Sequence, residues 1–242
     1  MSKSESQQAK SGKKMTKQKT TTKPKAASQG AKDFFGVQVL STRHTDIKKI
    51  KDNSPEPEIH GNKIWKASTL LVDFLEVDPP KKDMHVMDLG CGWGLSSIYC
   101  AQKHKTRVTS VDADKHVFPY LELHEKLNGV KLKKKIKRFE KLTSKDLSKI
   151  DEVIGSDICF WDELRDTLFE FVKRAFDAGV QRIVLADPGR SPFLELVDKV
   201  DELYETDLYE WDTKKPVKAD GYVVEIFNQP KSKKKQKNLK SA

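Results

Sequence analysis

Short apolar runs alternate along the chain with longer segments in which apolar residues recur every three or four positions. The short runs predict buried strands, and the longer segments predict helices with one apolar face. The predicted strands span residues 84–89, 107–111, 130–139, 152–160 and 180–186. Strands that alternate with helices in this order predict an α/β fold with a doubly wound sheet and right-handed crossovers.

The helical segments lead into a hairpin at the end of the domain. Gly129 directly follows the predicted helix at 117–128, and glycine is typical of the position that ends a helix. Apolar stretches at 208–211 and 222–227 have no long helix between them, which predicts an antiparallel hairpin, and residues 37–40 predict a further strand. The predicted helices span residues 67–75, 95–104, 117–128, 144–150, 162–178 and 193–203.

The third predicted strand carries most of its charge as lysine. Six of the eight residues at 131–138 are basic. This pattern is typical of an edge strand protected from further pairing, with Ile136 pointing inward. A stripe that faces RNA is the alternative interpretation.

The chain of 242 residues has a net charge of +10, and its two ends supply that charge. Residues 1–32 hold nine lysines and one glutamate, and residues 231–242 hold six lysines and no acid, whereas residues 33–230 have a net charge of −4. Both ends are almost free of large apolar side chains, which predicts two disordered basic tails around one folded domain at 33–230. The tails serve either as solubilising segments or as weak contacts to nucleic acid.

Signals for disulfides, metals and membranes are missing. Three cysteines without regular spacing argue against a disulfide framework, and no CxxC or His-x-His pair indicates a metal site. No apolar run approaches about 18 residues, and the N-terminus lacks the apolar core of a secretory signal. We expect a cytoplasmic monomer without a membrane partner. Structural or surface positions are expected for His60, His85, His104, His116 and His124.

The strand at 84–89 leads directly into a glycine-rich turn. Glycines occupy positions 90, 92 and 94, just after Asp88, and a helix begins near Leu95. Such glycines let a ligand approach the backbone without a Cβ clash, and the first N–H groups of the helix point into the crevice above the strand. The third glycine comes one residue too early for the G-x-G-x-x-G dinucleotide fingerprint.

The turn and the acid that ends the next strand resemble a known enzyme class. The G-x-G-x-G spacing after Asp88, with Asp112 ending the following strand, resembles the class I S-adenosylmethionine-dependent methyltransferases over roughly residues 60–228. The resemblance implies a seven-stranded Rossmann-like sheet, S-adenosyl-L-methionine as the cofactor, and Asp112 as the ligand of the ribose hydroxyls. The implied cofactor-binding residues are Trp65, Asp88, Gly90, Cys91, Gly92, Gly94, Asp112, Ala113, Phe139 and Asp157.

Three further stretches narrow the resemblance. Residues 64–68, 156–162 and 187–193 look like the protein-lysine methyltransferase group that includes the electron-transfer-flavoprotein β-subunit lysine methyltransferases. That group has D-x-x-Y after the fourth strand, where this chain has Phe160 in place of the tyrosine, and its flavoprotein-directed members share the D-P-G-R turn. The resemblance implies catalysis by Asp157, Phe160 and Trp161 and substrate binding by Asp187 and Arg190.

Structural roles remain open for the same residues. Asp157 would also cap the following helix, and Phe160 and Trp161 would also pack in the core. Asp187 would also form a turn before Pro188-Gly189.

The chemistry of methyl transfer suits these side chains. The reaction is an in-line displacement at the sulfonium methyl, so the enzyme's main task is alignment. Burial beside Phe160 and Trp161 would lower the pKa of an acceptor amine, and the rings would hold the cationic product. Asp157 would orient the amine by a charge-assisted hydrogen bond. We therefore predict an N-methyltransferase that acts on a protein lysine or amine.

Three other functions stay open. An RNA methyltransferase would use the basic tails and residues 131–138, although the [DN]-P-P-[YF] motif of base N6-methylation is absent. A small-molecule amine N-methyltransferase is a second alternative, since predicted nicotinamide-type methyltransferases share this core. A binding protein that has lost catalysis is the third, and the intact Asp88, glycine turn and Asp112 argue against it.

Overall fold

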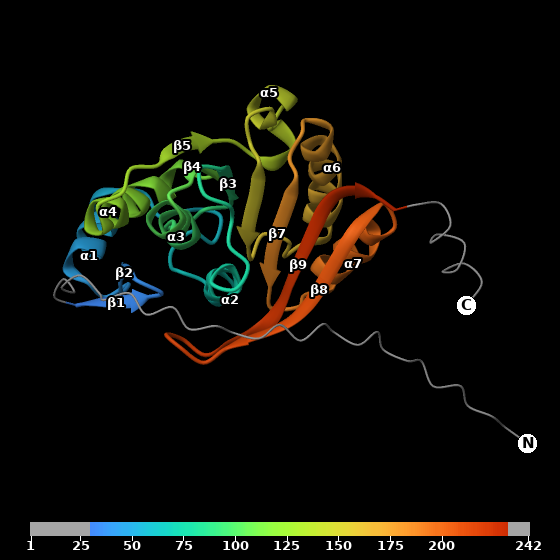
Figure 1. The fold of residues 1–242 in the computed structure, drawn as a ribbon. Coiled ribbons are helices and arrows are strands. Elements are labelled where there is room, and N and C mark those ends of the chain that lie inside the picture. Colours follow the sequence, from blue (N-terminus) through green and yellow to red (C-terminus); the bar gives the residue numbers. More distant parts are fainter. Residues whose placement is uncertain (1–29, 232–242) are drawn as a thin grey trace, which may run out of the picture.

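A computed structural model describes residues 30–231, so the predicted tails lie almost entirely outside the described residues. A seven-stranded sheet forms the centre of the domain (Figure 1). Both pairings of β9 are antiparallel and every other pairing is parallel, which confirms the predicted doubly wound sheet with a terminal hairpin. From edge to edge the strands are β5 (Lys133–Ile136), β4 (Arg107–Asp112), β3 (His85–Leu89), β6 (Glu152–Ser156), β7 (Arg182–Asp187), β9 (Ala219–Pro230) and β8 (Tyr204–Thr213).

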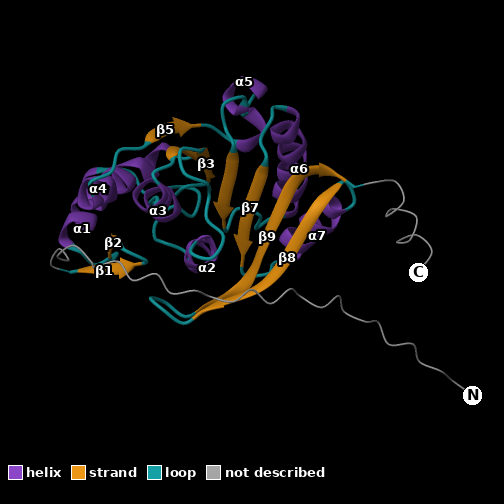
Figure 2. Cartoon of the chain, in the orientation of Figure 1, coloured by secondary structure: helices purple, strands orange, loops and turns teal. Residues whose placement is uncertain are grey.

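Successive residues of the central strands face two separate apolar layers, as the pleat of a β-strand requires. Val86 of β3 and Val184 of β7 belong to one buried cluster, whereas Met87 and Ile183 belong to another. Helices α2, α3 and α4 cover the first face, and α5, α6 and α7 cover the second (Figure 2). These helices are α2 (Lys66–Leu75), α3 (Leu95–His104), α4 (Phe118–Asn128), α5 (Ser144–Leu147), α6 (Asp162–Asp177) and α7 (Ser191–Asp201).

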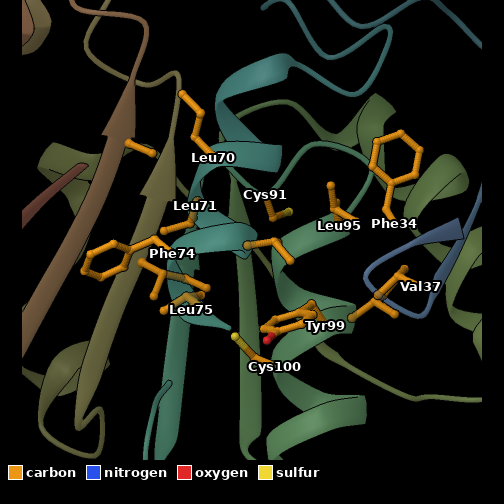
Figure 3. Close-up of a cluster of buried hydrophobic side chains, with 14 of the residues drawn as sticks. Phe34, Val37, Leu70, Leu71, Phe74, Leu75, Cys91, Leu95, Tyr99 and Cys100 are labelled. Atoms are coloured by element: carbon orange, nitrogen blue, oxygen red, sulfur yellow. The ribbon is translucent and has the colours of Figure 1, made fainter. Parts of the chain in front are cut away.

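Helix α2 packs between the sheet and α3 and is among the most deeply buried helices. Its apolar face contacts the layer that holds Tyr99 and Cys100 of α3 (Figure 3). The predicted members of that face, all buried, are Leu70, Leu71, Phe74 and Leu75. Trp65 is the N-cap residue of α2, so the burial of this helix also fixes where Trp65 lies.

An N-terminal addition covers part of α3 and α4. Strands β1 (Ala31–Phe34) and β2 (Val37–Leu40) form a separate two-stranded sheet, and α1 (Thr45–Asn53) follows it. The Leu40 amide donates to Nε2 of buried His124 (3.1 Å), and the Gln38 amide donates to Oδ1 of Asn128 (2.7 Å). His124 is therefore structural, as predicted, and β2 is confirmed. Neither β1 nor α1 was predicted.

The orientation predicted for Ile136 is wrong, although β5 is an edge strand as predicted. Ile136 is 58% exposed. Lys135 and Lys137, on either side of it, both pair with Asp146 in α5, so their side chains occupy the inner face of the strand. Alternation then turns Ile136 toward solvent.

The fourth strand is also shorter than predicted, because β6 ends at Ser156. Asp157 takes a positive φ of 60°, which ends the extended conformation. Within residues 30–231 we find no helix long and apolar enough to cross a membrane.

Candidate cofactor and acceptor site

The glycine turn follows β3 and lets α3 start close to the sheet. At Gly94, the N-cap of α3, φ is +81°, and an added Cβ would collide with the Leu121 side chain. At Gly92, φ is +49° and an added Cβ would meet nothing within 4 Å. The absence of a side chain at Gly94 therefore lets the start of α3 pack closely against Leu121 of α4. The absence of a side chain at Gly92 leaves a space open beside the backbone.

Asp112 ends β4 beside this turn. Its Oδ2 accepts the Gly92 amide and its Oδ1 accepts the Asp114 amide, both at 3.0 Å. Burial raises the pKa of the Asp112 carboxyl, although both backbone hydrogen bonds favour its charged form. A carboxylate has about four acceptor positions, so two remain for an incoming diol.

Asp88 lies at the end of β3, under the turn. Its Oδ2 accepts the Ser97 hydroxyl at 2.6 Å, and the Ser97 and Ser110 hydroxyls are 2.7 Å apart. Burial raises the pKa of Asp88 to about 6, against the opposing effect of the hydrogen bonds from Ser97. The nearby thiol of Cys91 is buried too, and burial raises its pKa well above the usual value, so it is not a nucleophile.

The main cleft lies above these residues and encloses about 810 Å³, including its open mouth. Its lining residues from the glycine turn and the neighbouring strand ends include Gly90, Gly92, Asp112, Ala113, Phe139, Ser156 and Asp157. A smaller turn pocket adjoins it and is lined by Asp88, Cys91 and Gly94, among others.

A third, aromatic pocket opens beside the main cleft. It is lined by His60, Trp65, Asp157, Phe160, Trp161 and Arg190. Trp65 lines all three cavities, whereas Asp157 and Phe160 line the main cleft and the aromatic pocket. The three cavities therefore lie next to one another at the carboxyl ends of the parallel strands, where α/β sheets bind their ligands, and we call them together the groove.

The rim of the aromatic pocket is a cluster of four rings. The His60 ring lies 5.2 Å from the Phe160 ring and about 6 Å from the rings of Trp65 and Trp161. The Phe160 and Trp161 rings are 4.6 Å apart. Trp161 is 55% exposed, so it is not a core residue.

Asp157, Arg190 and Asp187 form an ionic cluster at the base of this pocket. Arg190 Nη1 pairs with Oδ1 of Asp157 and, at 2.9 Å, with Oδ2 of Asp187. Asp187 is fully buried, and burial raises its pKa although the Arg190 contacts oppose this. Asp187 does not line any of the three cavities described above, so it forms the turn and holds Arg190.

The groove brings together every other residue predicted for the site. The predicted cofactor residues all line the main cleft or the turn pocket, and the predicted catalytic residues line the main cleft and the aromatic pocket. Asp157 does not cap α6, whose N-cap is Trp161 without a side-chain cap. His60, Lys63 and Ser156 also line the groove and were not predicted to do so. His60 contacts rings about a hundred positions away, and no local pattern signals such a contact.

The described part of the chain contains neither a candidate metal site nor a disulfide. No group of three or more His, Cys, Asp or Glu side chains among residues 30–231 is placed to hold a metal ion. All three cysteines are free and buried.

Residues 60–155 match the family model of the methyltransferase small domain. The chain is 27% identical to the electron transfer flavoprotein β subunit lysine methyltransferase of Rattus norvegicus over 134 residues, which cover 53% of this chain and 50% of the relative. The Xenopus laevis relative of the same name is 26% identical over 131 residues. The chain thus spans about half the length of the curated relatives it matches.

Solved structures share the fold. An rRNA methylase from Streptococcus thermophilus has a TM-score of 0.51 and 14% identity, covering 69% of this chain and 98% of its own. TrmK of M. capricolum, in complex with S-adenosylhomocysteine, also has a TM-score of 0.51 and 14% identity, covering 70% of this chain and 71% of its own. The described domain has the fold of the class I S-adenosylmethionine-dependent methyltransferases. Its cofactor is S-adenosylmethionine, and the groove is the candidate site for the cofactor and the methyl acceptor.

Proposed function

We propose that the protein is an N-methyltransferase that transfers the methyl group of S-adenosylmethionine to a lysine or amino-terminal amine of a protein. One observation carries the proposal. The aromatic pocket combines a cluster of four rings with the carboxylate of Asp157, and it shares these lining residues with the main cleft. Aromatic faces and a carboxylate together recognise an amine in both its neutral and its cationic form.

The residues of the main cleft fit the cofactor. The two remaining acceptor positions of Asp112 suit the ribose hydroxyls, and the open space at Gly92 admits the ligand against the backbone. Lys63 lines both the main cleft and the turn pocket, and its ammonium, 3.9 Å from the centroid of the Trp65 ring, offers a counter-charge to the cofactor carboxylate. The bound cofactor supplies an electrophilic methyl group on a sulfonium.

The aromatic pocket prepares the acceptor. Phe160 and Trp161 exclude water from the amine, which favours its neutral, nucleophilic form. Asp157 accepts a hydrogen bond from the amine and fixes the direction of its lone pair. Alignment of this kind contributes roughly 7–11 kcal/mol to a transfer between two bound groups. The same rings stabilise the methylated cation by about 0.5–2 kcal/mol each.

Exposed apolar side chains at the mouth of the groove favour a polypeptide as the methyl acceptor over a small amine. Trp161 and Ile59 both line the main cleft, and they are 55% and 38% exposed. A long lysine side chain reaches Asp157 while its backbone covers these exposed residues. The names of the curated relatives, which are protein-lysine methyltransferases, point the same way.

The basic stretch at 131–138 gives the RNA alternative little support. Lys134 pairs with Glu125 at 2.7 Å, and Arg138 pairs with Glu140 at 3.0 Å. Lys135 and Lys137 share Asp146. These cations are matched by acids of the same chain, which reduces the field available to phosphates. The RNA methylases among the solved structures share the fold alone.

A labelling assay tests the proposal. The full chain is incubated with methyl-labelled S-adenosylmethionine and a lysate of the source organism, and the products are treated with protease or with RNase. We expect label in material that protease removes and RNase does not, and none with the Asp157→Ala variant. Label that RNase alone removes would overturn the proposal.

A further inference from the structure

Asp157 has an unusual backbone conformation for a residue beside a reacting group. It follows β6 with a φ of 60°, and its amide donates to the carbonyl of Ala186 at 2.9 Å. Residues other than glycine keep a positive φ only where their surroundings enforce it. The conformation of Asp157 therefore depends on contacts with the end of β7 and the turn that follows.

Asp187 anchors that turn from inside the protein. Its Oδ1 accepts the amides of Gly189 and Arg190, both at 2.9 Å, which leaves Oδ2 for the Arg190 guanidinium. The turn cannot easily shift, because at Gly189 an added Cβ would lie 2.8 Å from the Tyr222 ring. The guanidinium is thus held from behind by a buried acid.

Arg190 uses one nitrogen, Nη1, to contact both acids. It lines the aromatic pocket and does not line the main cleft or the turn pocket. We propose that Arg190 is a positioning residue, which, anchored by Asp187, holds the Asp157 carboxylate in place to orient the acceptor amine. The inference rests on the proposed function.

The charge of this cluster also selects the acceptor. One guanidinium between two carboxylates leaves one net negative charge at the base of the aromatic pocket. That charge attracts a cationic amine and disfavours an anionic group. Since Nη1 of Arg190 is paired with both acids, we assign Arg190 to positioning Asp157 rather than to binding an acidic substrate. The pocket is therefore selective for amines over carboxylates.

Activity of Arg190 variants tests this role. We compare initial rates of label transfer from S-adenosylmethionine to the lysate proteins for wild type, Arg190→Ala and Arg190→Lys. Loss of alignment costs on the order of 100-fold in rate. We expect that loss in Arg190→Ala and a smaller loss in Arg190→Lys, with cofactor affinity by calorimetry unchanged. Arg165→Ala is the matched control, since Arg165 pairs with Glu195 and lines none of the three cavities.

Chemical rescue separates positioning from a merely structural role. Millimolar guanidinium should restore part of the rate of Arg190→Ala, because it replaces the lost cation between the two acids. It should not restore the rate of Asp157→Ala. A wild-type rate in Arg190→Ala, or no rescue in a variant that remains folded, would overturn the inference.

A stability measurement tests the Arg190–Asp157 ion pair independently of catalytic activity. Unfolding free energies of Arg190→Gln, Asp157→Asn and the double variant form a cycle, and we expect the double variant to lose less than the sum of the two single losses. If the two single losses of unfolding free energy simply add in the double variant, the inference is overturned even if the enzyme is active. If Arg190 and Asp157 are coupled in this cycle but the wild-type chain transfers no methyl group, only the proposed function is overturned.

Discussion

The amide of Gly92 donates to the carboxylate of Asp112 at 3.0 Å, which joins the glycine turn to the end of the neighbouring strand. A turn that follows β3 thereby orients an acid that ends β4. Asp112 lines the main cleft, where its remaining acceptor positions would suit a ribose diol.

Substitution of Asp112 should weaken cofactor binding. Hydrogen bonds to a charged group contribute about 1.5–3 kcal/mol, so Asp112→Ala should lower the affinity for S-adenosylmethionine by roughly 10-fold to 100-fold. Calorimetry on the purified protein measures this. Asp177→Ala, at the end of α6 and outside the groove, is the control. Equal affinities for Asp112→Ala and the control would contradict the assignment.

Two glycine variants should separate packing from binding. Gly94→Ala forces a methyl group into Leu121 at a positive φ, so it should lower the free energy of unfolding by about 1–3 kcal/mol. Gly92→Ala meets no neighbour within 4 Å, so apart from the strain of alanine at a φ of +49° its methyl group should mainly obstruct the cofactor. Urea unfolding and cofactor titration on both variants check this. The account fails if Gly92→Ala binds the cofactor as wild type does.

The half-exposed Trp161 should matter for the acceptor and little for stability. Loss of one cation–π contact of about 0.5–2 kcal/mol predicts a rise in the acceptor KM of about twofold to 30-fold for Trp161→Ala. Its unfolding free energy should change by no more than about 0.5 kcal/mol, as at other surface positions. An unchanged acceptor KM would remove Trp161 from the site.

Asp88 should make stability depend on pH. Burial raises its pKa from 3.8 to about 6, so between these values the native state keeps a proton that the unfolded state has released. The free energy of unfolding therefore falls as pH rises across this window, by up to about 3 kcal/mol from this group. Asp88→Asn lacks the titration, so its stability relative to wild type should rise with pH over the same window. Parallel pH profiles for the two proteins would contradict this.

Local signals were sufficient for the sheet, the glycine turn and Asp112. Periodicity identified α3 at its observed bounds, and the early third glycine distinguished the turn from a dinucleotide fingerprint. Such features depend on neighbours within a few positions of the chain. The role of Asp112 was implied by the family resemblance, and the parallel pairing of β3 with β4 places this acid beside the turn.

Features that depend on distant partners were missed or misjudged. Ile136 is exposed because Lys135 and Lys137 pair with Asp146 on the inner face of β5. The pattern of apolar residues in the sequence does not reveal this pairing. The ring of His60 joins Phe160 only in the folded chain. Nothing in the sequence signalled that Arg190, predicted to bind substrate, pairs with Asp157 and Asp187 in the folded chain.

The identity of the methylated atom tests the central claim most directly. The full chain is incubated with S-adenosylmethionine carrying a trideuterated methyl group and with lysate protein, and the products are digested and sequenced by mass spectrometry. We predict trideuterated methyl groups on lysine Nζ or amino-terminal nitrogen, absent when Asp157→Ala replaces the wild-type chain. Deuterated methyl groups found only on nucleotides, or on oxygen or carbon atoms of proteins, would contradict the account.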